Sequence, residues 1–507
     1  MFENQSPLHL KRLTFQPKIP SFLENAVCLQ TDGTKAPRLE IAKLFPLTAS
    51  TPKYNVVKGV SKHLENLKVG VLFSGGQAAG GHNVLWGLFD ALKGSQLIGF
   101  LDGIAGFLEN RFRIIDVDAI SEVRNLGGFD LIGSGRDKVE TKEQFDAATK
   151  NALKHDLDAL VIIGGDDSNT NGALLAEVFL AKGLKTKVIG VPKTIDGDLR
   201  SFEIEISFGF DSACRTYSEM IGNIERDALS AKKYTHFIKL MGRSASHITL
   251  ECALQTHPNL ALIGEEGKSL DQTIGSIADL IEKRAEKGKH YGVILVPEGL
   301  VEFIPEIKDL IHALNEKRQI EGKLKDTFEK IPEKVLSQFM LAKDPHGNIQ
   351  VSQIDTEQLL MSLVKEELLK RNFKHPLNFQ EHFFGYEGRA CLPTNFDATY
   401  CYALGRLVAV GIQEGLTGVI ASIQGLKNDV TEWRGSFIPT VSLMDLEERK
   451  GKLKPVIQKT LVDLKSRAYL EYKAKKDAWA LNDAYRFPGP IQFEGGKELS
   501  DLPPLTL

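Results

Sequence analysis

Residues 159–181 read ALVIIGGDDSNTNGALLAEVFLA, and this stretch decides the expected fold. Its first five residues are all apolar, which is typical of a strand that is buried on both faces. Two glycines and two aspartates follow at 164–167, and apolar residues then recur at helical spacing up to Ala181. A buried strand that passes through a glycine turn into a helix predicts a parallel α/β sheet.

Two neighbouring stretches repeat this pattern. Val69–Phe73 leads into Ser74-Gly75-Gly76 and a helical pattern, and Lys187–Val191 leads into PKTIDGD at 192–198. A second set of apolar runs, each ending in polar residues, follows at 236–240, 261–263 and 291–296. Because ligands bind at the carboxyl ends of strands in open α/β sheets, the two sets predict two α/β domains that face one cleft.

The rest of the chain is expected to be accessory. Residues 1–66 mix apolar runs with prolines and predict an extension that packs on the core, whereas 303–375 are rich in Lys, Glu and Leu and predict a helical insertion. Val456–Trp479 has helical spacing, and the last thirty residues predict irregular structure. We expect a phosphoryl-donor domain at 67–200 plus about 386–470, a sugar-phosphate domain at 201–385, and a C-terminal tail at 471–507.

Composition excludes several classes of function. The formal net charge is −3, so no overall basic field favours nucleic acid or an anionic membrane. The five cysteines form no CxxC pair, which argues against a disulfide framework or a zinc site. The sequence has no signal-peptide pattern and no run of about 18 apolar residues, so a cytoplasmic protein is expected.

Three of the turns could carry chemistry. The glycines around Gly75 can bring backbone N–H groups close to a phosphate, although a ligand-free tight turn fits them equally well. Asp166 and Asp167 suit a divalent metal beside phosphate, or an acidic helix N-terminus. In PKTIDGD a carboxylate could accept a hydroxyl proton while Lys193 neutralises phosphate charge; a solvated charged turn is the alternative.

Other polar residues follow the remaining strands. Arginine matches phosphate oxygens with its planar fork of donors, and glutamate can accept hydrogen bonds from sugar hydroxyls. Any one of these residues by itself is more often part of a surface ion pair, and only their coincidence at successive strand ends indicates a site. They are Met241-Gly242-Arg243, Glu298, Tyr386-Glu387-Gly388-Arg389 and Arg136 in the turn 133–136.

Taken in order, GGDDS (164–168), PKTIDGD (192–198), LMGR (240–243), PEG (297–299) and YEGR (386–389) resemble the long form of the pyrophosphate-dependent phosphofructokinases. The resemblance covers about residues 66–440. It implies two Rossmann-like three-layer α/β domains with the active site between them. It also implies transfer of a phosphoryl group from pyrophosphate to the 1-hydroxyl of fructose 6-phosphate, with Mg²⁺ as the cofactor and a homodimer as the assembly.

The resemblance also assigns expected roles. Asp196 resembles the catalytic base, with Asp198 and Arg243 beside it as further catalytic residues, and Asp166 resembles the metal ligand. Gly75 and Arg136 match contacts with the donor. The sugar-phosphate contacts are expected at Thr194, Met241, Gly242, Arg243, Glu298, Tyr386 and Arg389, and at Lys233 and Tyr234, which would reach the site of a neighbouring subunit.

Two positions are expected to choose the donor. Relatives that use ATP carry glycine where this chain has Asp167 and Lys193. A carboxylate at 167 would obstruct and repel the α-phosphate of ATP, and a lysine at 193 would hold the dense charge of pyrophosphate. The alternatives are an ATP-dependent 6-phosphofructokinase, a kinase of the lipid or NAD class, which would not explain MGR and YEGR, and a catalytically silent regulatory subunit, which would be expected to lose active-site residues that are present here.

Overall fold

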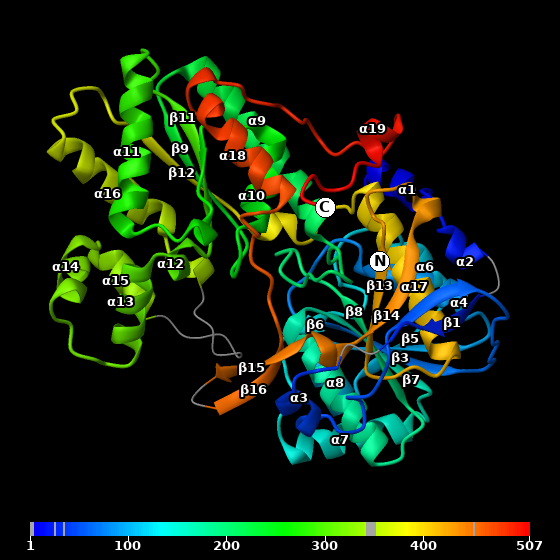
Figure 1. Ribbon diagram of the computed structural model, residues 1–507. Coiled ribbons are helices and arrows are strands. Elements are labelled where there is room, and N and C mark those ends of the chain that lie inside the picture. Colours follow the sequence, from blue (N-terminus) through cyan, green and yellow to red (C-terminus); the bar gives the residue numbers. More distant parts are fainter. Residues whose placement is uncertain (1–4, 25–26, 34–35, 341–350, 450–451) are drawn as a thin grey trace.

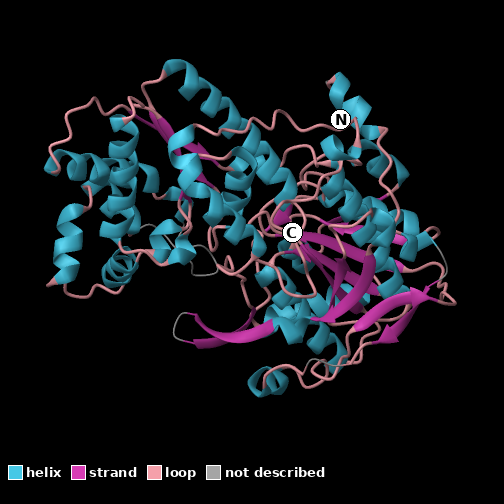
Figure 2. Cartoon of the chain, turned by 45° about the horizontal axis from the view of Figure 1, so that its top comes forward, coloured by secondary structure: helices cyan, strands magenta, loops and turns pink. Residues whose placement is uncertain are grey.

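The structure is a computed structural model that describes residues 5–24, 27–33, 36–340, 351–449 and 452–507. Two sheets, each covered by helices, form two lobes (Figures 1 and 2). The central strands of the large sheet are parallel, and its outer strands are antiparallel. Its spatial order is β1 (Val27–Thr31), β2 (Tyr54–Lys58), β14 (Arg434–Pro439), β13 (Val419–Gln424), β8 (Lys187–Pro192), β7 (Ala159–Gly164), β3 (Lys68–Ser74), β4 (Gln96–Phe100) and β5 (Phe112–Ile115), with β6 (Ser134–Gly135) beside β3.

The smaller sheet is parallel throughout its described strands. Its order is β10 (Leu260–Ala261), β11 (Gly292–Pro297), β9 (Thr235–Leu240) and β12 (Phe379–Phe384). Five of the six predicted strands are confirmed, with small shifts at their ends, as β3, β7, β8, β9 and β11. The sixth, predicted at 261–263, shares only Ala261 with the two-residue strand β10.

Both sheets lie between two layers of helices. In β7, Val161 and Ile163 pack into one core, while Leu160 and Ile162 pack into another on the opposite face. This alternation with a period of two buries both faces and gives three layers, as expected. The helices of the large lobe are α1 (Pro7–Leu13), α2 (Ser21–Glu24), α3 (Leu39–Leu44), α4 (Gly81–Ala91), α5 (Ile104–Glu109), α6 (Val117–Val123), α7 (Lys142–Lys154), α8 (Asp166–Ala181) and α17 (Asn395–Gln413).

Strand register aligns the motif turns. Ser74 of β3 pairs with Gly164 of β7, and Gly164 pairs with Pro192 of β8, so three of the turns leave the large sheet in one row. In the smaller sheet Leu240 pairs with both Pro297 and Phe384. The segments that begin at Met241, Glu298 and Gly385 therefore also leave side by side.

The predicted helical insertion is confirmed for its described part, while residues 341–350 lie outside the described residues. It contributes most of the helices that cover one face of the smaller sheet. The helices of this lobe are α9 (Phe210–Ala231), α10 (His247–Thr256), α11 (Leu270–Glu286), α12 (Leu300–Phe303), α13 (Pro305–Asn315), α14 (Lys323–Lys330), α15 (Glu333–Phe339), α16 (Thr356–Lys370) and α18 (Arg467–Asn482), and the short α19 (Lys497–Ser500) lies near the C-terminus.

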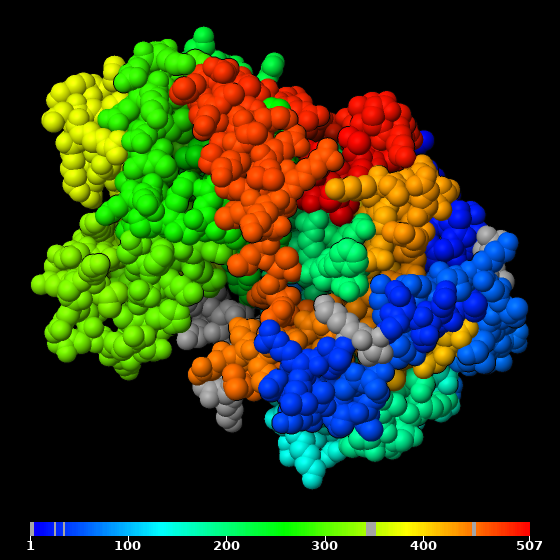
Figure 3. Space-filling view, viewed as in Figure 1, coloured from blue at the N-terminus to red at the C-terminus, as the bar shows by residue number. Residues whose placement is uncertain are grey.

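The prediction of a helix over Val456–Trp479 is wrong in its first half. Val456 belongs to β16 (Lys452–Ile457), which pairs with β15 (Met444–Arg449), and α18 begins only at Arg467. Residues 458–466 between them form a connection without helix or strand that passes from one lobe to the other (Figures 1 and 3). Tertiary contacts override the local helical spacing, because the backbone N–H of Thr460 donates to Asp198 O and that of Val462 to Glu265 Oε1.

The N-terminal region packs on the large lobe, as expected for its described residues. Its strands β1 and β2 extend the large sheet next to β14. The domain boundaries given above stay a prediction. Along the described parts of the chain, no helix is both long and apolar enough to span a bilayer.

Candidate active site

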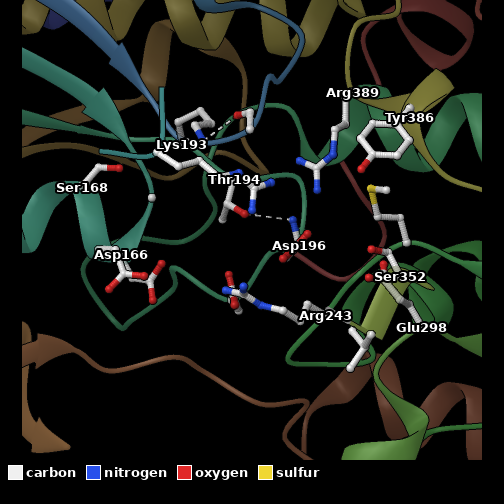
Figure 4. Close-up of a pocket in the computed structure, with 18 of the residues that line it drawn as sticks. Asp166, Ser168, Lys193, Thr194, Asp196, Arg243, Glu298, Ser352, Tyr386 and Arg389 are labelled. Atoms are coloured by element: carbon white, nitrogen blue, oxygen red, sulfur yellow. Dashed lines mark hydrogen bonds between the residues drawn. The ribbon is translucent and has the colours of Figure 1, made fainter. Parts of the chain in front are cut away.

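The two rows of motif turns enclose a cavity of about 450 Å³ between the lobes. Most of the residues expected in the site line it (Figure 4). From the large lobe these are Gly75, Arg136, Asp166, Asp167, Lys193, Thr194, Asp196 and Asp198, and from the smaller lobe and its neighbouring segments Met241, Arg243, Glu298, Tyr386 and Arg389.

One end of the cavity gathers cations against the glycine loop. Gly75 has a φ of +87°, and a Cβ added there would lie 3.1 Å from Lys193 Nζ. A Cβ at Gly76 would lie 2.8 Å from Arg389 Nη1 and 3.7 Å from Arg136 Nη2. Lys193 Nζ donates a hydrogen bond of 2.8 Å to Gly76 O. Only glycine leaves this space open, so two guanidinium groups and one ammonium group can approach the same backbone.

The pKa of Lys193 reflects burial and the concentration of positive charge at this end. Burial, followed by the nearby charge of Arg389 and the smaller effect of Arg136, lowers the pKa of Lys193 to about 7. A bound anion would reverse the effect of the guanidinium groups, since an opposite charge favours the protonated amine. The arrangement therefore suits a compact, highly charged anion such as a phosphate group.

Carboxylates occupy the middle of the cavity. The backbone N–H of Asp196 donates to Thr194 Oγ1 over 3.2 Å, which fixes the turn that presents the side chain. Asp196 Oδ1 is buried and has no hydrogen-bond partner among the described residues, and the same holds for Asp166 Oδ2. Burial and the charges of Asp196 and Asp166 raise the pKa of Asp198. This cluster is poised to bind a cation or to accept a proton.

The other end is lined from the smaller lobe. Glu298 accepts a 2.9 Å hydrogen bond from the backbone N–H of Gly242, whose φ of +136° favours glycine. Burial and the nearby Asp196 raise the pKa of Glu298 to about 7. Tyr386 lies near this end (Figure 4). The guanidinium group of Arg243 points toward the central carboxylates, and that of Arg389 reaches the glycine loop. A carboxyl group and a phenol at this end, with two guanidinium groups further in, suit a phosphorylated polyol.

Three expected residues do not line the cavity. Gly242 acts through its backbone contact with Glu298. Lys233 and Tyr234 precede β9, whereas the cavity lies at the end of that strand, roughly 20 Å away for a strand of this length. They cannot serve the cavity of their own chain, and their expected contact with a neighbouring subunit stays a prediction.

Sequence reasoning missed several lining residues. Gly76 belongs to the glycine loop, and Gly165 and Ser168 belong to the GGDDS motif. Their positions inside these motifs could have indicated that they line the site. Val351, Ser352 and Gln353 form a short 3₁₀ turn in the helical insertion, where nothing in the local pattern indicated a site. Lys459 lies beside the cavity on the connection between the lobes, with Nζ 2.9 Å from Ser244 Oγ and 3.9 Å from Asp166 Oδ2.

Comparison with known proteins identifies the family that the motifs resemble. The phosphofructokinase family model matches residues 68–412. The chain is 51% identical over 484 residues to the beta 1 subunit of an Arabidopsis thaliana pyrophosphate–fructose 6-phosphate 1-phosphotransferase, covering 90% of this chain and 85% of the relative. It is 45% identical over 540 residues to the Porphyromonas gingivalis enzyme of that name, and the match covers 99% of this chain and 98% of the relative.

Solved structures share the fold. A pyrophosphate-dependent phosphofructokinase from Nitrosospira multiformis superposes with a TM-score of 0.58 at 17% identity, covering 87% of this chain and 97% of that one. The family match spans the glycine loop, the central carboxylates and the arginine of the YEGR motif. From its sequence, its fold and the residues that line its cavity, this chain is a member of the phosphofructokinase family.

Proposed function

We propose that this protein transfers a phosphoryl group from inorganic pyrophosphate to the 1-hydroxyl of fructose 6-phosphate, reversibly and with Mg²⁺, to give fructose 1,6-bisphosphate and phosphate. One observation carries the proposal. Asp196 lies in one cavity between the cations at the glycine loop and the polar residues around Glu298. The printed names of the relatives from Arabidopsis and Porphyromonas describe the same reaction.

In this mechanism the protein acts mainly by positioning and by neutralising charge. Arg136 and Lys193 hold the donor phosphates against the glycine loop. Arg389, which the resemblance assigns to the sugar phosphate, reaches the same loop with Nη1 and would contact the donor there. Glu298 accepts hydrogen bonds from the sugar, while Arg243 and Tyr386 bind its phosphate. Asp196 Oδ1 takes the proton from the 1-hydroxyl as the hydroxyl oxygen attacks the phosphorus, and the P–O bond to the leaving phosphate breaks. The reverse reaction returns this proton to the sugar oxygen.

The residues fit a magnesium ion. Mg²⁺ commonly binds one or two carboxylates together with phosphate oxygens and waters, and Asp166 Oδ2 is a buried carboxylate oxygen with no hydrogen-bond partner among the described residues. Within the same residues no cluster of three or more metal-binding side chains occurs, so Asp166 would need substrate oxygens or waters as further ligands. When bound, the ion would neutralise charge on the transferred phosphoryl group.

The alternatives differ in donor and in activity. An ATP-dependent enzyme would need space where Asp167 lines the cavity. A silent subunit would be expected to lack the central carboxylates, which are present. The Porphyromonas gingivalis relative, 45% identical over 99% of this chain, is named as the enzyme itself rather than as a subunit. These observations favour the pyrophosphate-dependent, active form.

The test is to incubate the purified protein with fructose 6-phosphate and Mg²⁺, with pyrophosphate or ATP as the only donor, and to measure fructose 1,6-bisphosphate. We expect product with pyrophosphate, little with ATP, and phosphate-dependent reversal. Asp196→Asn is the matched control for contaminating activity. Product with ATP alone would establish the ATP-dependent alternative, and no product with either donor would favour the silent subunit.

We also propose a cytoplasmic homodimer. All five cysteines, each within the described residues, are free thiols, as is usual in a reducing compartment. Lys233 and Tyr234 are too far from their own cavity to serve it, so a second copy is the partner that would use them. Light scattering measures the mass of the assembly, and Lys233→Ala tests the contact through the KM for fructose 6-phosphate.

A further inference from the structure

The donor-selecting carboxylate has a cationic partner that the motif pattern did not indicate. Lys138 Nζ lies 3.3 Å from Asp167 Oδ1, and the two side chains are only 16% and 12% exposed. Sequence reasoning treated Asp167 as a charge that repels the α-phosphate of ATP. An ammonium group at this distance offsets much of that charge, so simple repulsion is an incomplete account of how Asp167 acts.

The main chain next to Lys138 is attached to α8 independently of the ion pair. The N–H of the next residue, Val139, donates a 2.6 Å hydrogen bond to Asn171 Oδ1. Asn171 is buried and lies one helical turn after Asp167 on α8, so both residues share one face of that helix. Two positions before Lys138 in the sequence is Arg136, which lines the cavity. The segment 136–139 is therefore attached to the helix that carries Asp167, and removing the carboxylate leaves its attachment intact.

We propose that Lys138 and Asp167 form one donor-selecting unit, in which Asp167 occupies and masks an anion subsite whose cation is Lys138. In the native protein the ion pair fills the space beyond the two phosphates of pyrophosphate. Without the carboxylate, the same ammonium group faces the place that a third phosphate needs, and it becomes the ligand of the α-phosphate of a nucleoside triphosphate. This inference rests on the proposed function, since it explains the choice of donor at the same site.

The pair predicts non-additive effects of substitution. Lys138→Met alone removes the ammonium group but keeps the carboxylate of Asp167 in the subsite, so ATP remains excluded. Asp167→Gly alone opens the subsite with its cation present, so use of ATP rises. In the double variant the space is open but the cation is gone, and most of the gain is lost.

The experiment measures kcat/KM for ATP and for pyrophosphate in four proteins: unsubstituted, K138M, D167G and D167G/K138M. It also measures binding of ATP without fructose 6-phosphate by isothermal titration calorimetry. We expect D167G to raise kcat/KM for ATP about tenfold or more, and K138M to remove about 80% or more of that gain in the double variant. D167G/K138R, which retains a cation, should keep most of it. Binding of ATP should follow the same order.

Matched controls exclude general effects. Lys454→Met removes a lysine from an exposed ion pair with Glu140, 2.7 Å long, and should leave both donors unaffected. Asp167→Ser replaces D167G if the glycine variant folds poorly. Equal use and binding of ATP by D167G and D167G/K138M would overturn the inference, as would a failure of both D167G and D167S to gain ATP binding. If the unsubstituted protein shows no activity with pyrophosphate, the proposed function is overturned instead. The calorimetric measurements of ATP binding to the four proteins would still decide the role of Lys138.

Discussion

Lys239 Nζ lies 3.0 Å from Glu357 Oε2 in the interior, where the two side chains are 2% and 7% exposed. Lys239 belongs to β9, and Glu357 lies in the first turn of α16. The ammonium group also donates a 2.8 Å hydrogen bond to Ile354 O. Because Ile354 directly follows the 3₁₀ turn Val351–Gln353, these contacts connect β9 to the part of the helical insertion that lines the cavity.

Removing one member of this pair should be costly. Lys239→Met would leave a buried carboxylate without its cation, so we expect a loss of about 3–5 kcal/mol in the free energy of unfolding. The double variant K239M/E357L should recover much of that loss, because no buried charge remains. Urea denaturation measures both. If the double variant is no more stable than K239M, the pair does not account for the loss.

Asp196→Asn keeps the size of the side chain but cannot accept the hydroxyl proton. We expect kcat to fall by about 10²-fold to 10⁴-fold while binding of fructose 6-phosphate stays nearly the same. Steady-state kinetics gives kcat, and calorimetric titration with the sugar phosphate measures binding. A variant that turns over at a near-native rate would remove Asp196 from the mechanism as its base.

Lys193 should take up a proton when the donor binds. Its pKa is lowered to about 7 by burial and by the neighbouring guanidinium groups, so about half of the protein carries a neutral amine at pH 7. A phosphate anion raises this pKa, and the amine becomes fully charged. Titration of the protein with pyrophosphate in two buffers of different ionisation enthalpy gives the number of protons taken up.

Lys193→Met is the reference for that measurement, because pyrophosphate itself also exchanges protons. The native protein should take up about 0.5 proton more than K193M at pH 7, and the difference should fall towards zero at pH 5.5, where the amine is already protonated. Equal uptake by both proteins at pH 7 would show that the amine of Lys193 is not the group that titrates.

Glu298 should make the ligand-free protein less stable as the pH rises. Its pKa is raised to about 7 by burial and by Asp196, so between about pH 4.5 and 7 the folded state binds a proton that the unfolded state has released. The contribution of Glu298 to the free energy of unfolding is therefore fully present at pH 4.5 and is lost as the pH rises through 7. Because the side chain is buried, this contribution is about 3 kcal/mol.

Glu298→Gln removes the titration and should flatten the pH dependence by up to that amount. Chemical denaturation at pH 5 and pH 8, without substrates or divalent metal, compares the two proteins. If the stability of E298Q falls between these pH values as much as that of the native protein, the burial of Glu298 is not the cause of the decrease.

Much of the site was predictable because its residues follow buried strands directly. An apolar run such as Ala159–Ile163 indicates a strand through its composition alone, and the residues after it must emerge at the edge of the sheet. The order of the motifs then indicated the family. Local helical spacing was misleading at Val456, where pairing with β15 and contacts with the other lobe favour an extended chain.

The sequence by itself therefore determined which turns line the cavity, because strand burial and glycine turns are local properties of the chain. Tertiary structure alone decided which side chains meet. Lys138 and Asp167 are 29 positions apart, and the hydrogen bond of Val139 to Asn171 brings them together. Lys459 reaches Asp166 from nearly 300 positions away. Such contacts depend on how separate elements pack in three dimensions, and no periodicity in the sequence records that packing.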